Sequence, residues 1–511
     1  MPPKLLKTVL TIVVVVLMVG VSFVQRELVR ERDELGISRY TELKGAPPVL
    51  QLTTVALGGF RGLISNILWM RASDLQENDK FFEMVQLADW ITKLEPHFTQ
   101  VWLVQSWNMA YNISVKFKDP EDRWRWVQRG IELLRDQGLV YNPDDVLMYR
   151  ELAWFFQHKM GQNLDDANMY YKQMWLKEMS TVLGMDKPDW DALIHPKTED
   201  EKKRATLLRE KYKMDPVFMK EVDDRYGPLE WRLPETSAIY WAALGLRAAK
   251  NDQQRIDPND LITLRRVIYQ SMQLAFQRGR LIVDNADRQF DFGPNLSNIP
   301  NANNVYLEAM TDDEKNRDHI ATAHRNFLRD AVFLLYTYNR QADAQTWFNY
   351  MATNYPDKPL LDGKPNTLPK NMDLDSYAMG RIQEELNDPG RDKAEGLIEG
   401  FERQAYESLA VGDDDRYIGM DSLAKKLWNF YESKVGVNEA SRERVGLKSV
   451  AEIKQRVLDR LLDGEMSPQL TAQLRTRLGL PAATAPGSST NSIPSLPVST
   501  NTPPATNAVA Q

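Results

Sequence analysis

The most constraining feature of the sequence is a two-part apolar pattern that occurs twice with the same internal spacing. In the first copy, residues three to four positions apart would share one face of a helix: Tyr149, Leu152, Ala153 and Phe156. A turn begins at Gly161, and a second set follows: Leu164, Ala167, Tyr170, Tyr171 and Met174. The second copy has Leu328, Ala331, Val332 and Leu335, then Ala344, Trp347, Phe348 and Met351. The pattern predicts antiparallel helix pairs that bury their apolar faces by stacking on neighbouring pairs.

Other residues mark where one helix pair ends and the next begins. Trp241, Leu244 and Gly245 form the pattern W-x-x-L-G, and Trp102 with Ser106 gives a weaker version directly after Pro96. Pro143 precedes Tyr149 in the same way, and Pro356 closes the last pair. On these residues the sequence resembles the tetratricopeptide repeat (TPR) family, in its membrane-anchored bacterial form. The resemblance implies an all-α fold with a TPR-like helical solenoid over residues 80–358.

Two segments within this range depart from the repeat pattern. Residues 182–235 match no repeat, and residues 285–304 are rich in Asn, Asp and Pro, which predicts a long inserted loop. Because these insertions interrupt the period, an irregular helical bundle is the alternative to a regular solenoid.

The N-terminus carries a predicted membrane anchor over residues 1–25. Lys4 and Lys7 precede a run of 17 uncharged residues, Thr8 to Val24, that is dominated by Val, Ile and Leu. As a helix this run would extend about 26 Å, enough to cross a thin bilayer core. A cleaved signal peptide and a buried core helix are the alternatives. The short N-terminal stub favours a single-pass protein with most of the chain on the periplasmic side, although arginines also follow the run.

The rest of the chain divides by composition. Residues 26–79 are expected to form juxtamembrane helices, including a mostly apolar run over 49–70 that packs on the first repeat or lies on the membrane. The Pro-rich segment 359–372 is predicted to be a linker, and 373–480 a smaller C-terminal helical region. Residues 481–511 carry no charge and are rich in Pro, Ala, Ser, Thr and Asn, so a disordered tail is expected.

Charge and residue types argue against several function classes. A net charge of −7 argues against a nucleic-acid partner, and the absence of Cys excludes disulfides and thiol chemistry. No phosphate-binding loop, nucleophile elbow or H-E-x-x-H motif is present, so we expect no cofactor, no metal and no enzymatic activity. His319 and His324 lie about 140° apart on a helix and are interpreted as exposed polar residues.

The resemblance also implies where a ligand would bind. In such repeats the first helix of each pair lines a groove, with contacts one residue after the opening aromatic and four residues beyond that. Carried onto this chain, those positions are Leu103, Trp107, Arg150, Trp154, Ala242, Leu246, Arg329 and Phe333. Five of them suit a peptide, because Arg binds carboxylates and aromatic rings supply contact area: Trp107, Arg150, Trp154, Arg329 and Phe333.

These observations predict a membrane-tethered helical-repeat scaffold that binds a protein or peptide partner, within an envelope assembly or secretion complex. A carboxylate-based enzyme in the two inserted segments is one alternative. A purely structural spacer, which sets a distance from the membrane, is the other.

Overall fold

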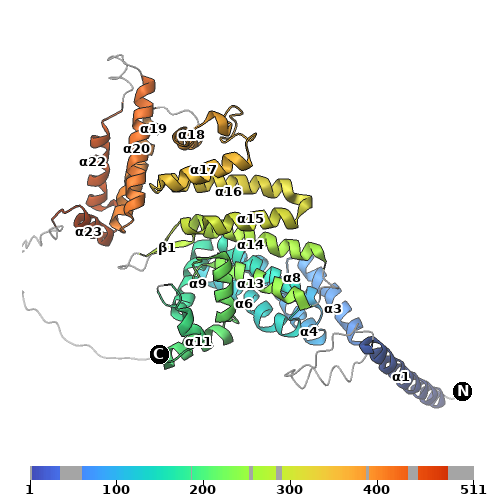
Figure 1. Ribbon diagram of the computed structural model, residues 1–511. Coiled ribbons are helices and arrows are strands. Elements are labelled where there is room, and N and C mark those ends of the chain that lie inside the picture. Colours follow the sequence, from blue (N-terminus) through green and yellow to red (C-terminus); the bar gives the residue numbers. More distant parts are fainter. Residues whose placement is uncertain are drawn as a thin grey trace, which may run out of the picture. The chain divides into compact units, whose positions relative to one another are not determined.

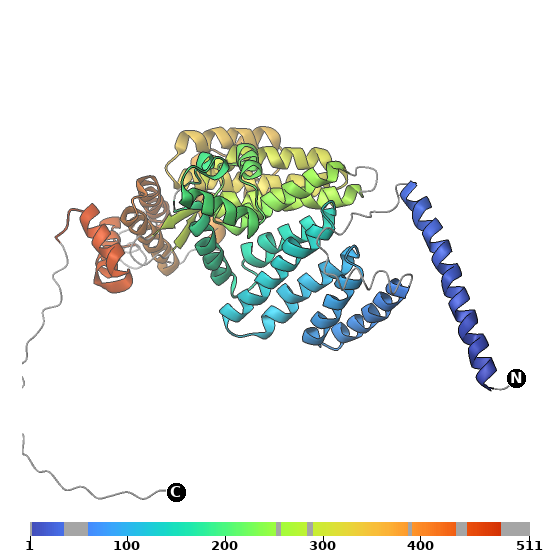
Figure 2. The ribbon, with the colours of Figure 1, turned by 90° about the horizontal axis from the view of Figure 1, so that it is seen from below.

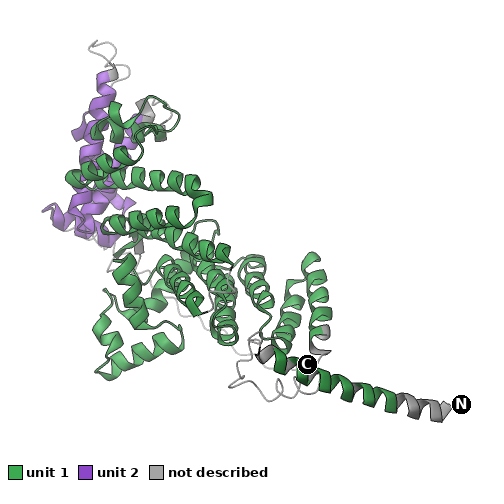
Figure 3. Ribbon diagram, turned by 45° about the vertical axis from the view of Figure 1, so that its right-hand side comes forward, with its two compact units in different colours: residues 1–389 green, residues 390–511 purple. Residues whose placement is uncertain are grey.

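The computed structural model describes residues 3–34, 60–185, 187–251, 257–283, 290–386, 391–435 and 447–481. Within these residues the chain is all-α, as expected, apart from one antiparallel hairpin. Its strands are β1 (Arg280–Val283) and β2 (Phe290–Gly293), with Arg280 opposite Gly293. The chain divides into two compact units, residues 1–389 and 390–511 (Figure 3). Each unit is built from helices that pack within it.

The first part of unit 1 consists of paired rods, several of them extended by π-helical turns. Its elements are α1 (Pro3–Glu34), α3 (Phe60–Glu77), α4 (Phe81–Leu94), α5 (Thr99–Trp107), η1 (Asn108–Ile113), η2 (Ser114–Lys116), α6 (Pro120–Glu132), η3 (Leu133–Gly138), α7 (Leu139–Tyr141), α8 (Val146–Trp154), η4 (Phe155–Gly161) and α9 (Asn168–Leu183). Asn108, Leu133 and Phe155 keep right-handed helical geometry at the junctions, so η1, η3 and η4 prolong α5, α6 and α8. Figure 2 shows the blue and cyan helices from α3 to α8 as a row, in which α3 packs on α4 and α4 on α5.

The same hydrogen bond closes two successive helix pairs. The indole Nε1 of Trp102 donates to the carbonyl oxygen of Pro96 at 2.9 Å. The hydroxyl of Tyr149 donates to the carbonyl oxygen of Pro143 at 2.8 Å, again six residues earlier. An aromatic donor at the start of one first helix therefore ties down the turn that precedes it. This contact explains why Pro and the aromatic residue recur together in the sequence.

The row of helices continues past the segment 182–235 that matched no repeat. This segment forms a lobe of three helices, α10 (Trp190–Ile194), α11 (Glu199–Glu210) and α12 (Pro216–Tyr226), while α8 and η4 pack directly on α13 (Pro234–Ala248). Gly245 makes this close packing possible, because a Cβ at residue 245 would lie 2.7 Å from the Cβ of Tyr149. The insertion thus leaves the contact between neighbouring first helices intact.

Helices that follow one another along the chain also pack in sequence through the rest of unit 1 (Figure 1). After α13 come η5 (Ala249–Asn251), α14 (Pro258–Arg278), the hairpin, η6 (Leu296–Asn298), α15 (Ile299–Asp312), η7 (Glu314–Asn316), α16 (Arg317–Thr337), α17 (Gln341–Asn354), η8 (Pro369–Asn371) and α18 (Leu374–Leu386). The expected loop over 285–304 therefore includes β2, η6 and the first turns of α15. Pro300 fits the first turn of α15, where its missing N–H costs no helical hydrogen bond.

The segment predicted to be a linker, residues 359–372, packs within unit 1. Leu360 and Leu361 are buried, at 1% and 3% exposure, and the backbone N–H of Leu360 donates to the carbonyl oxygen of Thr367 at 2.7 Å. Helix α18 follows it in the same unit, whose boundary falls at residues 389 and 390. The Pro-rich composition thus marks an irregular, packed connection that differs from a linker between units.

None of the helices among the described residues is both long enough and apolar enough to cross a membrane. In the run Thr8 to Val24, the side chains of residues 8–11, 15 and 18 lie outside the described part. The tail predicted to be disordered, apart from Pro481, and residues 35–59 of the predicted juxtamembrane segment also lie outside it.

The close approach at Gly245 gives a first prediction. We expect Gly245→Ala to destabilise unit 1 by about 1–3 kcal/mol, because the new methyl group forces α13 away from α8. The free energy of opening is measured by hydrogen exchange in α8 and α13. Gly62→Ala is the matched control: a Cβ there meets only one side-chain oxygen, 3.9 Å away, and should raise stability by about 0.5–1 kcal/mol. Equal effects of the two substitutions would contradict the packing argument.

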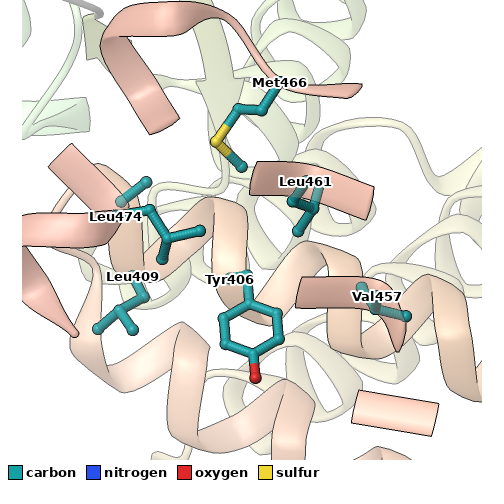
Figure 4. Packing of buried hydrophobic residues seen from close by; sticks show 7 residues of the cluster. Tyr406, Leu409, Val457, Leu461, Met466 and Leu474 are labelled. Atoms are coloured by element: carbon teal, nitrogen blue, oxygen red, sulfur yellow. The ribbon is translucent and has the colours of Figure 1, made fainter. Parts of the chain in front are cut away.

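Unit 2 consists of α19 (Arg391–Ala410), α20 (Asp414–Val435), α22 (Val450–Arg460), η9 (Leu461–Glu465) and α23 (Pro468–Arg477). Ser449 and Glu452 form a capping box that starts α22. Figure 4 shows the core, in which the following side chains face one another: Tyr406, Leu409, Val457, Leu461, Met466 and Leu474. Helix α19 contributes to this core along its length, since it packs on α20, α22 and α23.

Unit 2 also contains a buried carboxyl group. Glu402 on α19 is 0% exposed, and neither of its carboxylate oxygens has a hydrogen-bond partner among the described residues. The nearest cation is Lys454 at 3.8 Å, but Lys454 is held more closely by Asp421 at 2.5 Å. Burial raises the pKa of Glu402 to about 7; the positive charges of Lys454 and Lys425 oppose the rise, and Asp421 adds to it.

This pKa predicts a pH dependence of stability. The ordinary pKa of Glu402 is 4.5 and the folded value about 7, so the folded unit retains a proton that the unfolded chain has lost between these values. The free energy of unfolding therefore falls as pH rises from about 4.5 to 7, by on the order of 3 kcal/mol. Glu402→Gln should remove this slope, as measured by protection of α19 amides against exchange. Glu407→Gln, on the exposed side of α19, should retain it.

Candidate functional site

Two of the predicted groove residues lie at the ends of neighbouring first helices and belong to one row of rings. Trp107 ends α5 and stacks on Tyr111, with ring centroids 5.4 Å apart and planes 19° apart. Trp154 ends α8 and stacks on His158 at 4.6 Å and 10°. The two stacks meet where the Tyr111 hydroxyl lies 3.1 Å from Nδ1 of His158. We call Trp107, Tyr111, His158 and Trp154 the aromatic row.

Arg150 lies one helical turn before Trp154. Its guanidinium forms an ion pair of 2.9 Å with the carboxylate of Glu151, and its side chain is 32% exposed. Burial raises the pKa of Glu151, and the charge of Arg150 opposes that rise. The buried Nε of Arg150 has no hydrogen-bond partner among the described residues. Only Nη2 of Arg150 donates to Glu151, so Nη1 retains donors that this ion pair does not use.

A cavity of about 430 Å³ opens beside the aromatic row, lined by Tyr111, His158 and a charged cluster. In this cluster Asp165 accepts from Arg123 and from Lys159, each at 2.6 Å. Arg123 also reaches Asp166 at 2.7 Å. The side chains of Arg123, Lys159 and Asp165 are all less than 10% exposed, whereas that of Asp166 is 84% exposed.

The pKa values of this cluster follow from burial and charge. Burial alone would raise the pKa of Asp165, but the hydrogen bond from Lys159 and the backbone N–H of Ala167 hold it below its ordinary value. Burial lowers the pKa of Lys159, and the contact with Asp165 opposes this. Burial and then the charge of Lys159 lower the pKa of His158, which favours a neutral imidazole in the aromatic row.

Arg329 and Phe333 take part in a different set of contacts. Arg329 on α16 is only 4% exposed and forms ion pairs with Asp362 at 2.8 Å and Glu384 at 3.2 Å. Phe333 is half-buried beneath the guanidinium of Arg381 on α18, at 5.6 Å. Helix α18 and the preceding loop thus cover the face of α16 that carries both residues. Of the remaining positions, Leu103 and Leu246 are half-buried and Ala242 is fully buried.

The interpretation of His324 as an exposed residue was wrong. It is 1% exposed, and its ring nitrogens lie 2.7 Å from the Tyr355 hydroxyl and 2.8 Å from Oδ1 of Asn303. Burial lowers its pKa to about 4, so the ring is neutral near pH 7. Tyr111 and His158 were not selected from the sequence, although each lies four residues after a selected tryptophan and so shares its helix face.

The inserted lobe contributes to a second hollow. A groove of about 900 Å³ lies between α12, α13, α14 and α15. Its three carboxylates are each paired with an arginine: Glu221 with Arg247, Glu308 with Arg225, and Asp312 with Arg265. Among the described residues, no group of three or more acidic or histidine side chains is arranged to hold a metal.

Comparison of the chain with models of protein families, with curated protein sequences and with solved structures finds no match in any of the three. Arguments about function therefore rest on the residues and contacts described above.

The charged cluster gives a prediction that separates two adjacent aspartates. Asp165→Asn should destabilise unit 1 by about 3 kcal/mol or more, because it leaves Arg123 and Lys159 buried without a carboxylate between them. Asp166→Asn removes a highly exposed partner and should cost less than about 1 kcal/mol. Urea unfolding followed by circular dichroism measures both. If the two substitutions lower the free energy of unfolding by similar amounts, the buried ion pairs of Asp165 do not contribute more to stability than the exposed ion pair of Asp166.

Proposed function

We propose that the chain is a membrane-tethered, TPR-like scaffold that binds an extended segment of another protein along the aromatic row. The aromatic row itself is the observation that carries this proposal. It joins two neighbouring first helices, so a single bound segment would contact both. Trp107 is 38% exposed, and Trp154 and Tyr111 are half-buried. Partly exposed Trp and Tyr rings supply contact area for proline or apolar side chains, while Arg150 adds a donor for a carboxylate.

The repeat character of unit 1 supports the TPR-like part of the proposal. The recurring bond from an opening aromatic to a proline carbonyl, and the stacking of α5 on α8 and of α8 on α13, give three first helices in succession. At least three stacked units are what a helical-repeat domain needs for stability. The W-x-x-L-G residues support the same assignment, because Gly245 admits Tyr149, the opening aromatic residue of the preceding helix pair.

The sequence run Thr8 to Val24 and the exposure of α1 support the membrane tether. Ten described apolar side chains of α1 are between 47% and 67% exposed: Ile12, Val13, Val14, Val16, Leu17, Val19, Val21, Phe23, Val24 and Leu28. An apolar surface of this kind is unfavourable in water and favourable in lipid. We propose that α1 inserts in a membrane with the N-terminus in the cytoplasm, which places the scaffold on the periplasmic side, in an envelope assembly or secretion complex.

The two alternatives have less support. A carboxylate-based enzyme in the inserted segments would need acidic groups available in a cavity, whereas Glu221, which the described part of these segments contributes to the groove, faces Arg247. A structural spacer needs no binding surface, so it does not account for the partly exposed rings that are aligned across two helices.

Site-specific photocrosslinking tests the proposal. A photoreactive amino acid replaces Trp107 or Trp154 in the full chain in its native membrane. We expect both positions to yield the same adduct of defined mass, because one segment passes both rings. An Arg150→Ala substitution in the same chain should reduce the yield several-fold, since it removes the neighbouring donor.

Lys202 provides the control position, since it lies on the exposed face of α11 in the inserted lobe. The same photoreactive residue there should yield no such adduct. Equal crosslinking from Lys202, or no adduct from either tryptophan position, would favour the spacer over the scaffold.

A further inference from the structure

The groove beside the inserted lobe has an apolar floor built from four helices. Each helix contributes residues three or four positions apart, so that one stripe of each faces the hollow. Phe218 and Val222 on α12 are 7% and 3% exposed. Ile268 on α14 and Val305 on α15 are 3% and 7% exposed. These side chains form the apolar floor of the groove.

Charged side chains form the rim of this groove, and their ion pairs join helices on its different sides. Arg225 on α12 pairs with Glu308 on α15 at 2.9 Å, and Arg247 on α13 pairs with Glu221 on α12 at 3.6 Å. All four side chains are more than half exposed, so each pair contributes less than about 1 kcal/mol and opens readily. Lys250 at the same rim forms no ion pair with any described residue.

We propose that this groove binds a single-chain amphiphile with an anionic head group, such as a fatty acid or a monoalkyl phosphate. The alkyl chain lies on the apolar floor, and the head group is held at the rim by Arg225, Arg247 and Lys250. A guanidinium has five N–H donors, of which one ion pair uses only some, so an anion binds beside the existing carboxylates.

Size and charge distinguish this ligand from other occupants. A volume of about 900 Å³ falls within the range of roughly 300–1,000 Å³ typical of small-molecule sites. A docked helix is about 10–12 Å across, so the groove would hold only about two of its turns. A cationic head group would meet four basic side chains, those of Arg225, Arg247, Lys250 and Arg265, against three acidic ones.

Displacement of a fluorescent fatty acid tests this proposal. The full chain is kept in solution by a non-ionic amphipathic polymer, and dansyl-labelled undecanoic acid is the probe. Four competitors share one alkyl chain and differ in head group: dodecanoate, dodecyl phosphate, dodecyltrimethylammonium and dodecyl maltoside. We expect the two anions to displace the probe at least about tenfold better than the cation or the neutral sugar. The better of the two anions distinguishes a carboxylate from a phosphate ligand.

Two variants locate the binding. Ala243→Phe fills the groove and should weaken probe binding about tenfold or more. The double variant Arg225→Ala/Arg247→Ala changes only exposed side chains and should abolish the preference for anions. If Ala243→Phe does not fold, the double arginine variant still tests whether the groove binds the anionic head group. The matched control is Arg340→Ala, which breaks an exposed ion pair with Asp343 away from the groove and should change nothing.

Equal displacement by all four competitors would overturn the proposal. So would anion preference that survives the double arginine variant, or unchanged probe binding in a folded Ala243→Phe chain. None of these outcomes bears on the aromatic row, because no residue of the groove belongs to it.

Discussion

The distance between neighbouring first helices is the constraint on which the rest of unit 1 depends. Helix α13 lies against α8 so closely that residue 245 has no room for a Cβ beside Tyr149. Tyr149 also fixes the preceding turn through its hydroxyl, so one side chain sets both the start of α8 and its spacing from α13. Because α8 continues into η4, the same rod carries Trp154 at its middle and His158 near its end. The packing of α13 on α8 therefore bears directly on the half of the aromatic row that α8 and η4 carry, whereas Trp107 and Tyr111 lie on α5 and η1.

The helical class and much of the pairing could be predicted because they depend on short-range spacing. Apolar residues three to four apart define a buried face whatever lies opposite, and Leu152, Phe156, Tyr171 and Leu328 are buried as that argument requires. Leu164 of the same pattern is 74% exposed, because it lies before the start of α9. Trp107 and Trp154 were selected through a family pattern, and they do flank one row. Their companions Tyr111 and His158 become recognisable only when two helices are seen side by side.

The remaining sites could not be predicted because the covering element is remote in sequence. Nothing local to Arg329 indicates that Glu384 and Asp362 will surround it, more than thirty residues away. His324 was interpreted as exposed because it does not share a helix face with His319, whereas Asn303 and Tyr355 supply its hydrogen bonds from other elements. Composition was equally ambiguous: Asn and Pro around residue 300 are compatible with a loop and with the first turn of a helix. Polar residues reveal their role only through their partners, and these partners come from tertiary structure.

The inserted lobe has a consequence for how such a molecule diversifies. Its three helices lie between α9 and α13 in the sequence, and α13 still packs directly on α8. The lobe also packs on this array, because the rings of Phe218 and Trp231 lie against Tyr240 of α13, so its sequence can vary only where these contacts are kept. Helix α12 supplies one wall of the groove. Substitutions on this face of α12 would therefore change which ligands the groove binds and leave the contact between α8 and α13 unchanged.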